Sequence, residues 1–133
     1  MGAVAVSSVR TRTVLVVDDE AVVRTVLRRF FVRRGWDVVE AESAERALEL
    51  LDGDGLPDLI VCDLNLPGMS GSVLCRRVVA RHPRLAAYFI LTSGDPLAAA
   101  TALERESLPC RLLAKPFTIG DLDRLIDAVT RAA

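Results

Sequence analysis

The chain has 133 residues, a formal net charge of −1 and 51% hydrophobic residues. These values predict one domain with a single core, because about 100–200 residues per domain is usual. The near-zero charge argues against direct nucleic-acid binding, and no apolar run reaches the roughly 18–20 residues of a membrane span, so we expect neither partner.

Short apolar runs alternate with amphipathic patterns along the chain. We expect residues 1–12 to form a flexible tail and residues 13–133 to form the domain. Continuous apolar and β-branched runs predict five strands, at 13–17, 36–41, 58–62, 87–91 and 110–114. Helical periodicity and capping residues predict five helices, at 20–34, from Ser43 to Gly53, at 70–81, at 95–107 and from Thr118 to Val129.

The strict alternation of five strands and five helices indicates the fold class. It predicts an α/β domain with a five-stranded parallel sheet and helices on both faces. Five strands favour the flavodoxin-like (βα)5 arrangement with strand order 2-1-3-4-5 over a full dinucleotide-binding fold. Neither a G-x-G-x-x-G motif nor a P-loop is present, which argues against nucleotide binding.

The three cysteines, Cys62, Cys75 and Cys110, are an odd number without C-x-x-C spacing. This pattern argues against a zinc site or a disulfide framework and fits a reducing cytosol. We therefore interpret these cysteines as small buried hydrophobic residues.

Polar residues follow four of the five predicted strands. In an open parallel sheet the ligand site lies beyond the carboxyl ends of the strands, so these residues are expected to meet at one edge. They are Asp18, Asp19 and Glu20 after the first strand, Asp63 after the third, Thr92 and Ser93 after the fourth, and Lys115 after the fifth.

Several carboxylates in one cleft repel each other unless a cation lies between them. Oxygen ligands favour Mg²⁺, and a lysine with a hydroxyl is suited to hold phosphoryl oxygens, so the set indicates phosphoryl transfer onto Asp63. Each residue also has an ordinary structural interpretation, as a helix N-terminal acid, a turn residue, a loop residue or a solvated lysine. Their coincidence at four strand ends favours a site.

Four segments carry a resemblance to a known family. The segments "VLVVDDE", "DLIVCDLNLPGMSG", "ILTSGD" and "LLAKPF" resemble the bacterial two-component response-regulator receiver domain. The resemblance covers about residues 12–131, with the motifs in the order and spacing of the family. It is compatible with a single-domain regulator and with the receiver of a hybrid histidine kinase; the initiating Met1 slightly favours the first.

The resemblance implies a cytoplasmic phosphorelay protein that works with Mg²⁺. Asp63 would accept a phosphoryl group from a histidine kinase or a histidine phosphotransfer protein. Asp19 and Asp63 would bind Mg²⁺ directly, Asp18 through water, and Asn65 through its backbone carbonyl. The output would pass to a protein partner that the sequence does not identify, and a homodimer is compatible with the family.

The resemblance also assigns the phosphoryl-binding and switch residues. Thr92 would be the switch hydroxyl, with Ser93 beside it, and Lys115 would bind the phosphoryl group. Pro116 follows that lysine where the family often has a cis peptide bond. One position departs from the family, because Leu112 stands where many receivers carry a Tyr or Phe that reports phosphorylation.

Without that aromatic residue, another element has to report the signal. The predicted helix at 95–107 is rich in alanine and has only Leu97 and Leu103 as large apolar anchors, so it buries little apolar area. We expect this helix to be weakly docked and to shift when Thr92 moves toward the phosphoryl group.

Two other function classes stay open at this point. The first is a receiver-like scaffold that binds a partner without phosphorylation. The second is a phosphatase of the haloacid dehalogenase kind, which also uses an aspartate nucleophile with Mg²⁺. That family places a D-x-D motif after its first strand, whereas Asp63 follows the third, so the resemblance to receivers takes precedence. We expect no enzyme beyond self-directed phosphoryl transfer and hydrolysis.

Overall fold

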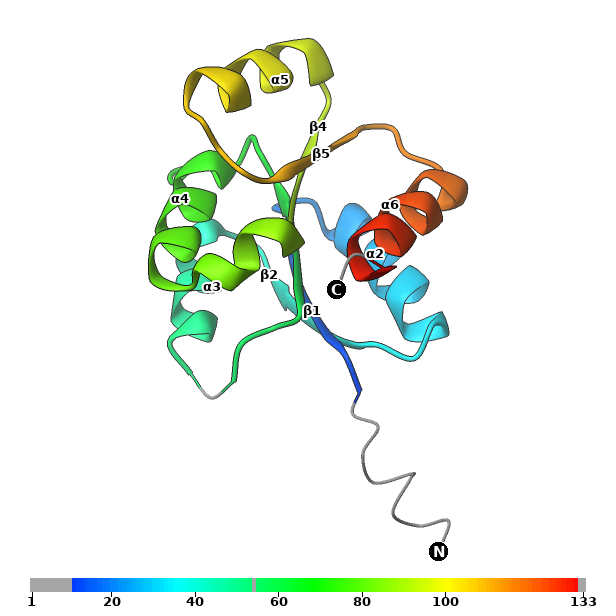
Figure 1. The fold of residues 1–133 in the computed structure, drawn as a ribbon. Helices are drawn as coiled ribbons and strands as arrows, with labels where there is room; N and C mark the ends of the chain where they lie inside the picture. The colour runs from blue at the N-terminus through cyan, green and yellow to red at the C-terminus, as the bar shows by residue number, and fades with distance from the viewer. Residues whose placement is uncertain (1–10, 54, 132–133) are drawn as a thin grey trace, which may run out of the picture.

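The computed structural model describes residues 11–53 and 55–131, which form one five-stranded parallel sheet with helices on both faces. The strand order is β2-β1-β3-β4-β5, which confirms the predicted arrangement (Figure 1). The strands are β1 (Thr13–Val17), β2 (Asp37–Ala41), β3 (Leu59–Asp63), β4 (Phe89–Ser93) and β5 (Arg111–Ala114).

The helices lie on the two faces of this sheet, α3 and α4 on one side and α2 and α6 on the other (Figure 1). Their bounds are α2 (Ala21–Arg33), α3 (Ala44–Leu51), α4 (Gly71–Arg81), α5 (Pro96–Arg105) and α6 (Ile119–Arg131). A short 3₁₀ helix, η1 (Pro83–Tyr88), lies between α4 and β4. None of the helices in the described part of the chain has the length and apolar character needed to cross a membrane.

Four of the helices, α3, α4, α5 and α6, begin where their capping residues predict. Ser43, Ser70 and Asp95 each accept a hydrogen bond from the backbone N–H three residues further on. At the start of α6 the caps are reciprocal: the Thr118 N–H donates to Asp121 Oδ2 over 2.9 Å, and the Asp121 N–H donates to Thr118 Oγ1 over 3.0 Å. The local sequence thus sets the points at which these helices leave the sheet.

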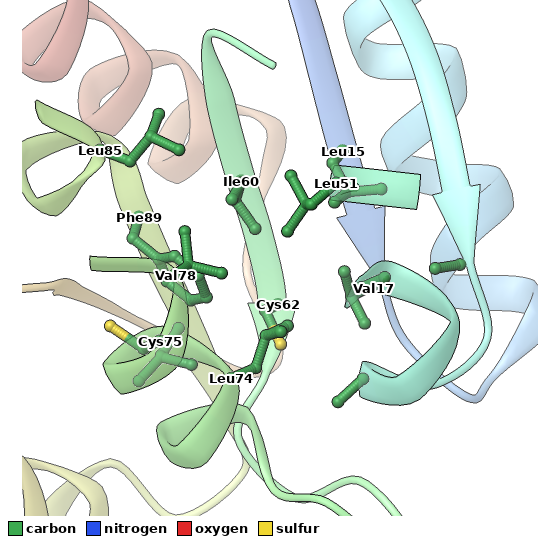
Figure 2. Packing of buried hydrophobic residues seen from close by; sticks show 14 of the residues in the cluster. Leu15, Val17, Leu51, Ile60, Cys62, Leu74, Cys75, Val78, Leu85 and Phe89 are labelled. Carbon is green, nitrogen blue, oxygen red and sulfur yellow. The ribbon is translucent and has the colours of Figure 1, made fainter. Parts of the chain in front are cut away.

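The core is divided by the sheet because successive strand residues point to opposite faces. The face covered by α3, α4 and α5 carries Leu15, Val17, Ile60, Cys62, Phe89 and Leu91. The face covered by α2 and α6 carries Val14, Val16, Leu59, Val61, Ile90 and Leu113. Figure 2 shows residues of the first cluster, among them Leu74, Cys75 and Val78 of α4 with Ile60 and Cys62 of β3 and Phe89 of β4.

The bounds of the predicted strand at 87–91 differ from the structure. Pro83 opens η1, which continues to Tyr88, so β4 begins only at Phe89 and runs to Ser93. Thr92 and Ser93 are therefore buried strand residues rather than loop residues. In the same way β3 extends by one residue and ends on Asp63 itself.

Two predicted apolar contacts are wrong. Apolar residues recur at helical spacing in the helix predicted at 20–34 and form an expected buried stripe, made of Val22, Val23, Val26, Leu27, Phe30 and Phe31. Val22 is nevertheless 75% exposed. Leu97, the other expected anchor of the helix at 95–107, is 82% exposed, so Leu103 and Ala99 are the buried contacts of α5. A periodic pattern does not show whether another element lies opposite it.

The expected tail lies mostly outside the described residues, since the structure describes only residues 11 and 12 of it. The carbonyl oxygen of Arg12 accepts a hydrogen bond from the Asp37 N–H over 2.8 Å. The guanidinium of Arg12 lies 5.6 Å from the ring centre of Trp36. The contacts of Arg12 thus continue the pairing of β1 with β2 just before the start of β1.

Candidate functional site

Four of the predicted site residues share one face of the sheet. The core positions of β1, β3, β4 and β5 on the α2–α6 face are two residues apart, and the same alternation continues to Asp18, Asp63, Thr92 and Lys115. Asp18 and Lys115 directly follow their strands, whereas Asp63 and Thr92 lie within theirs. The parallel register therefore brings four polar side chains to one edge of a single face.

The Lys115 side chain joins two of these residues. Its Nζ atom donates to Asp18 Oδ2 over 3.0 Å and to Asp63 Oδ2 over 3.2 Å. Burial alone lowers the pKa of Lys115, but the hydrogen bonds and charges of the two aspartates outweigh burial and hold the pKa above its usual 10.5. The lysine is therefore a fixed positive charge between two buried carboxylates.

Asp63 is 6% exposed and makes a second contact through its other oxygen. The Asn65 N–H donates to Asp63 Oδ1 over 3.1 Å, which fixes the orientation of the carboxylate. Burial raises the pKa of Asp63 above its usual 3.8, against the opposing effects of the Asn65 N–H and the Lys115 charge. Asn65 itself is exposed.

Asp18 is the most buried acid of the site and is held from both sides. Its carboxylate Oδ1 accepts the Glu20 N–H over 2.9 Å, and its carbonyl oxygen accepts a hydrogen bond from Arg24 Nη1 over 2.7 Å. The backbone N–H of Asp18 donates to the Ala41 carbonyl over 3.1 Å. These contacts leave the other carboxylate oxygen of Asp18 directed at Lys115.

The acidic residues are close enough to share a cation. One carboxylate oxygen each from Asp18, Asp19, Glu20 and Asp63 lies within 4.8 Å of the others, with Asp19 and Glu20 on the exposed side. This donor set contains only carboxylate oxygens, which suit a hard divalent cation such as Mg²⁺ better than zinc or copper. The residues therefore fit the predicted metal.

Thr92 lies beside Asp63 in the neighbouring strand. Their Cα atoms are register partners in the β3–β4 pair, and both side chains lie on the same face of the sheet. The Leu64 N–H donates to the Thr92 carbonyl over 2.9 Å, which continues the ladder past Asp63. Thr92 is 1% exposed, so its side chain is buried on the face of the sheet that also carries the Asp63 carboxylate.

Ser93 does not join this group, although it is the next residue in the chain. The alternation of the strand turns its side chain to the opposite face, where its Oγ atom accepts the Asp95 N–H over 3.0 Å. This bond orders the turn into α5. Thr92 therefore shares a face with Asp63, whereas Ser93 does not.

Lys115 is positioned by its backbone as well as by its ion pairs. The Lys115 N–H donates to the Ser93 carbonyl over 2.7 Å, and the Lys115–Pro116 peptide bond is cis. Leu112 is half-buried and packs on the α3–α4 face, where it is the register partner of Leu91. It is thus on the side of the sheet away from Thr92.

Gly71 supports the site, although the sequence patterns do not single it out. A Cβ atom on Gly71 would lie 2.9 Å from Leu64 Cα and closer still to the Asp63 carbonyl oxygen. The first residue of α4 therefore packs against the end of β3 in a way that only glycine permits. The available sequence signal is a glycine directly after the N-cap Ser70, and it has that meaning only once the close approach is seen.

Comparison with known proteins assigns the family. Residues 14–129, almost the whole chain, match the family described as the response regulator receiver domain. The chain belongs to this family.

Relatives of known function contain this receiver domain within longer chains. The transcriptional regulatory protein AfsQ1 of Streptomyces coelicolor is 34% identical over 119 residues, which cover 90% of this chain and 51% of that protein. The DNA-binding transcriptional regulator NtrC of Escherichia coli K12 is 33% identical over 119 residues, which cover 90% of this chain and 24% of NtrC. The receiver domain described here thus spans about a quarter to a half of the length of these relatives.

Solved structures agree with the fold over nearly their full length. A response regulator receiver protein from Pseudomonas putida is 34% identical with a TM-score of 0.77, covering 90% of this chain and 98% of that one. A putative response regulator from Chloroflexus aurantiacus is 31% identical with a TM-score of 0.79, covering 92% of this chain and 99% of that one. The receiver domain is therefore a regulatory domain of the two-component signalling class.

Proposed function

We propose that this receiver domain is a phosphorylation-dependent signalling switch with Asp63 as its phosphoacceptor. The donor is a histidine kinase or a histidine phosphotransfer protein in the cytoplasm, and the output is a conformational change read by a protein partner. The observation that carries the proposal is the contact of Lys115 with Asp63, beside an acidic cluster suited to a divalent cation.

The transfer needs a carboxylate oxygen that can reach phosphorus. An oxygen of Asp63 forms a bond to the phosphorus atom while the P–N bond of the donor histidine breaks, and the electron pair returns to the imidazole nitrogen. Lys115 stays close to the transferred oxygens as a positive charge, and the Asn65 N–H keeps the carboxylate oriented. Later attack by water on the phosphorus breaks the acyl phosphate and restores the Asp63 carboxylate.

The acidic residues would hold the metal. Asp19 and Asp63 would bind it directly, Asp18 would bind it through water, and the Asn65 backbone carbonyl would complete the protein contribution. When bound, Mg²⁺ supplies positive charge that offsets the repulsion between these carboxylates and the incoming phosphoryl oxygens.

The response to the phosphoryl group starts at Thr92. Its hydroxyl lies on the same face as Asp63 in the adjacent strand, within the part of the sheet that leads into α5. Leu112 offers no aromatic ring to report the change, and α5 is anchored mainly by Ala99 and Leu103. Movement of Thr92 toward the phosphoryl group therefore changes the position of α5.

The test is intact-mass spectrometry after incubation with acetyl phosphate, with and without Mg²⁺. We expect a gain of one phosphoryl group that depends on Mg²⁺ and is absent in Asp63→Asn. Asp52→Asn is the matched control, because Asp52 is exposed and contacts Arg81 instead of the site. A phosphoryl group gained by Asp63→Asn would contradict the assignment of the acceptor.

Beryllofluoride with Mg²⁺ provides the second arm, because it does not depend on the reactivity of a small donor. We expect altered amide exchange in α5 and altered fluorescence of Trp36. A wild-type chain that responds neither to acetyl phosphate nor to beryllofluoride would refute the switch and favour a scaffold that binds its partner without phosphorylation.

A further inference from the structure

Arg24, in the first turn of α2, is bound to the backbone of the acidic loop at residues 18–20. Its Nη1 atom donates a hydrogen bond to the Asp18 carbonyl oxygen over 2.7 Å. That oxygen belongs to the peptide unit that joins Asp18 to Asp19. Among the described residues, the ion pair of Arg24 is with Glu40 and not with an acid of the site. The guanidinium therefore holds the backbone between two of these acids and leaves their carboxylates free for other contacts.

The neighbouring strand fixes the guanidinium of Arg24 through a second contact. The Nε atom lies 3.4 Å from Glu40 Oε1, and the other carboxylate oxygen of Glu40 accepts a hydrogen bond from Arg28 Nη1 over 2.6 Å. Glu40 lies in β2 one residue before Ala41, whose carbonyl oxygen accepts the Asp18 N–H. β2 therefore holds the acidic loop twice, once through its backbone and once through Glu40 and Arg24.

These two side chains are better shielded from water than the ion pairs along the helix surfaces. The Arg24 side chain is 20% exposed and that of Glu40 is 27% exposed, whereas Arg46 and Glu49 are 49% and 67% exposed. Solvent screening makes an exposed ion pair weak, and a shielded charged donor forms a stronger bond to a carbonyl oxygen. The contact of Arg24 with the backbone is therefore suited to restrain the loop.

The acidic loop needs a restraint because its carboxylates repel each other. The four acids of the site have oxygens within 4.8 Å of one another, and repulsion between like charges favours spreading them apart. Lys115 pairs with Asp18 and Asp63. Within the described ranges no ion pair involves Asp19 or Glu20, and α2 begins without a hydrogen bond from a side-chain cap. The positions of the two exposed acids therefore depend on the backbone of the loop.

We propose that Arg24, oriented by Glu40, is a positioning residue that keeps the acidic loop arranged for a divalent cation in the metal-free domain. Its bond to the Asp18 carbonyl restrains the peptide unit before Asp19, so the Asp19 carboxylate stays beside those of Asp18 and Asp63. A preorganised site binds a cation more tightly, because less of the binding free energy is used to order the ligands. The inference rests on the proposed function in one respect, the use of Asp19 as a metal ligand.

Positioning and charge predict opposite effects for the loss of Arg24. As a positive charge near the acids, Arg24 repels a cation, so removal of the charge alone would strengthen Mg²⁺ binding. As a positioning residue, Arg24 favours Mg²⁺ binding, so its removal weakens that binding. For Glu40 both effects have the same sign, because neutralising this acid removes a negative charge and also releases Arg24. The direction of the change in Arg24→Met therefore distinguishes the two explanations.

The first test is a titration of the unphosphorylated chain with Mg²⁺, followed by the backbone amide shifts of Asp19 and Asn65. We expect the dissociation constant of Mg²⁺ to rise about 10-fold in Arg24→Met and by a smaller factor in Glu40→Gln. Because Glu40 acts through Arg24, the double variant is expected to match Arg24→Met. Glu40→Gln keeps the size of its side chain and the charge of Arg24, so the restraint stays testable if Arg24→Met does not fold.

Arg29→Met is the matched control for the loss of a positive charge from α2. Arg29 is an exposed cation on the same helix, and no ion pair in the described part of the chain includes it. We expect this variant to bind Mg²⁺ at least as tightly as the wild type.

The second test measures the rate of phosphorylation by acetyl phosphate as a function of the Mg²⁺ concentration. We expect Arg24→Met to need about 10-fold more Mg²⁺ for half of its maximal rate, and its maximal rate to change by less than about 2-fold. The reason is that Arg24 contacts neither Asp63 nor Lys115. A lower maximal rate with an unchanged requirement for Mg²⁺ would contradict a positioning role.

Three results of the titration would overturn the proposal: unchanged or tighter Mg²⁺ binding in Arg24→Met, an equal loss in Arg29→Met, or no response of Asp19 to Mg²⁺ in the wild type. The fate of the proposed function is separate. A wild-type chain whose Mg²⁺ binding depends on Arg24 but which gains no phosphoryl group would keep this inference and reject the switch. A wild-type chain that is phosphorylated on Asp63, with unchanged Mg²⁺ affinity in Arg24→Met, would reject only the inference.

Discussion

The ammonium nitrogen of Lys115 lies 3.2 Å from a carboxylate oxygen of Asp63, although 52 residues separate them in the chain. The same nitrogen lies 3.0 Å from a carboxylate oxygen of Asp18, so the ammonium group of Lys115 forms ion pairs with two buried acids. Their mutual position follows from parallel strands whose carboxyl ends meet at one edge. It also makes the site sensitive to the loss of a single positive charge.

Removing that charge is expected to destabilise the metal-free fold. Lys115→Met leaves Asp18 and Asp63 without their cation, and we expect a loss of about 1–3 kcal/mol in the free energy of unfolding, a value below that of fully buried pairs because Lys115 is partly solvated. Mg²⁺ is expected to stabilise the variant more than the wild type. Urea unfolding with EDTA and with Mg²⁺ measures both effects.

Arg111→Met is the matched control for this experiment, since Arg111 is an exposed cation on β5. An equal loss of stability in the two variants, or an equal effect of Mg²⁺, would show that the contact of Lys115 with the acids is not the cause.

The close approach of α4 to β3 predicts that alanine is destabilising at one glycine and tolerated at another. Gly71→Ala places a methyl group against the Asp63 carbonyl and Leu64, and we expect a loss of about 1–3 kcal/mol with slower phosphorylation of Asp63. Gly94→Ala meets nothing within 4 Å and is expected to change stability by less than about 0.5 kcal/mol. Thermal or urea unfolding of both variants tests the pair. A neutral Gly71→Ala would contradict the packing described here.

The exposure of two leucines on α5 predicts which of them holds the helix. Leu103→Ala removes a side chain that is 9% exposed, and we expect a loss of about 2 kcal/mol with faster amide exchange throughout α5. Leu97→Ala removes a side chain that is 82% exposed and is expected to leave both quantities nearly unchanged. Hydrogen exchange followed by mass spectrometry distinguishes the two. Equal effects of the two substitutions would contradict the conclusion that Leu103, and not Leu97, anchors α5.

The cap of α6 predicts a dependence of stability on pH. The hydrogen bond from the Thr118 N–H holds the pKa of Asp121 below its usual 3.8. A group with a lowered pKa in the folded state stabilises the fold above its unfolded pKa, and this contribution is lost as the pH falls through its folded pKa. The difference in stability between the wild type and Asp121→Ala is therefore expected to be constant near neutrality and to shrink in the acidic range below 3.8.

Urea unfolding at several pH values measures this difference. Asp127→Ala on the same helix is the control, because among the described residues Asp127 forms its ion pair with Arg131, at the end of α6. A difference that grows toward acid pH would have the wrong sign for a capping carboxylate.

The local patterns in the sequence are sufficient to predict the order and the type of the main helices and strands. Ser43, Ser70 and Asp95 cap their helices as predicted, because a cap depends on residues only a few positions apart. The predicted start of β4 lies too early, since the turn from Pro83 extends as a 3₁₀ helix. The apolar stripe predicted on α2 is too broad, and Leu97 is not an anchor of α5, because burial also requires an element on the opposite side.

The local sequence predicts which residues form the site. Asp18, Asp63, Thr92 and Lys115 lie together because the carboxyl ends of parallel strands share one edge. Only the tertiary structure separated Thr92 from Ser93, since the pleat of β4 turns adjacent side chains to opposite faces. The need for glycine at Gly71 was also decided there. These relationships depend on the packing of segments that are distant in the chain, and no local pattern records that packing.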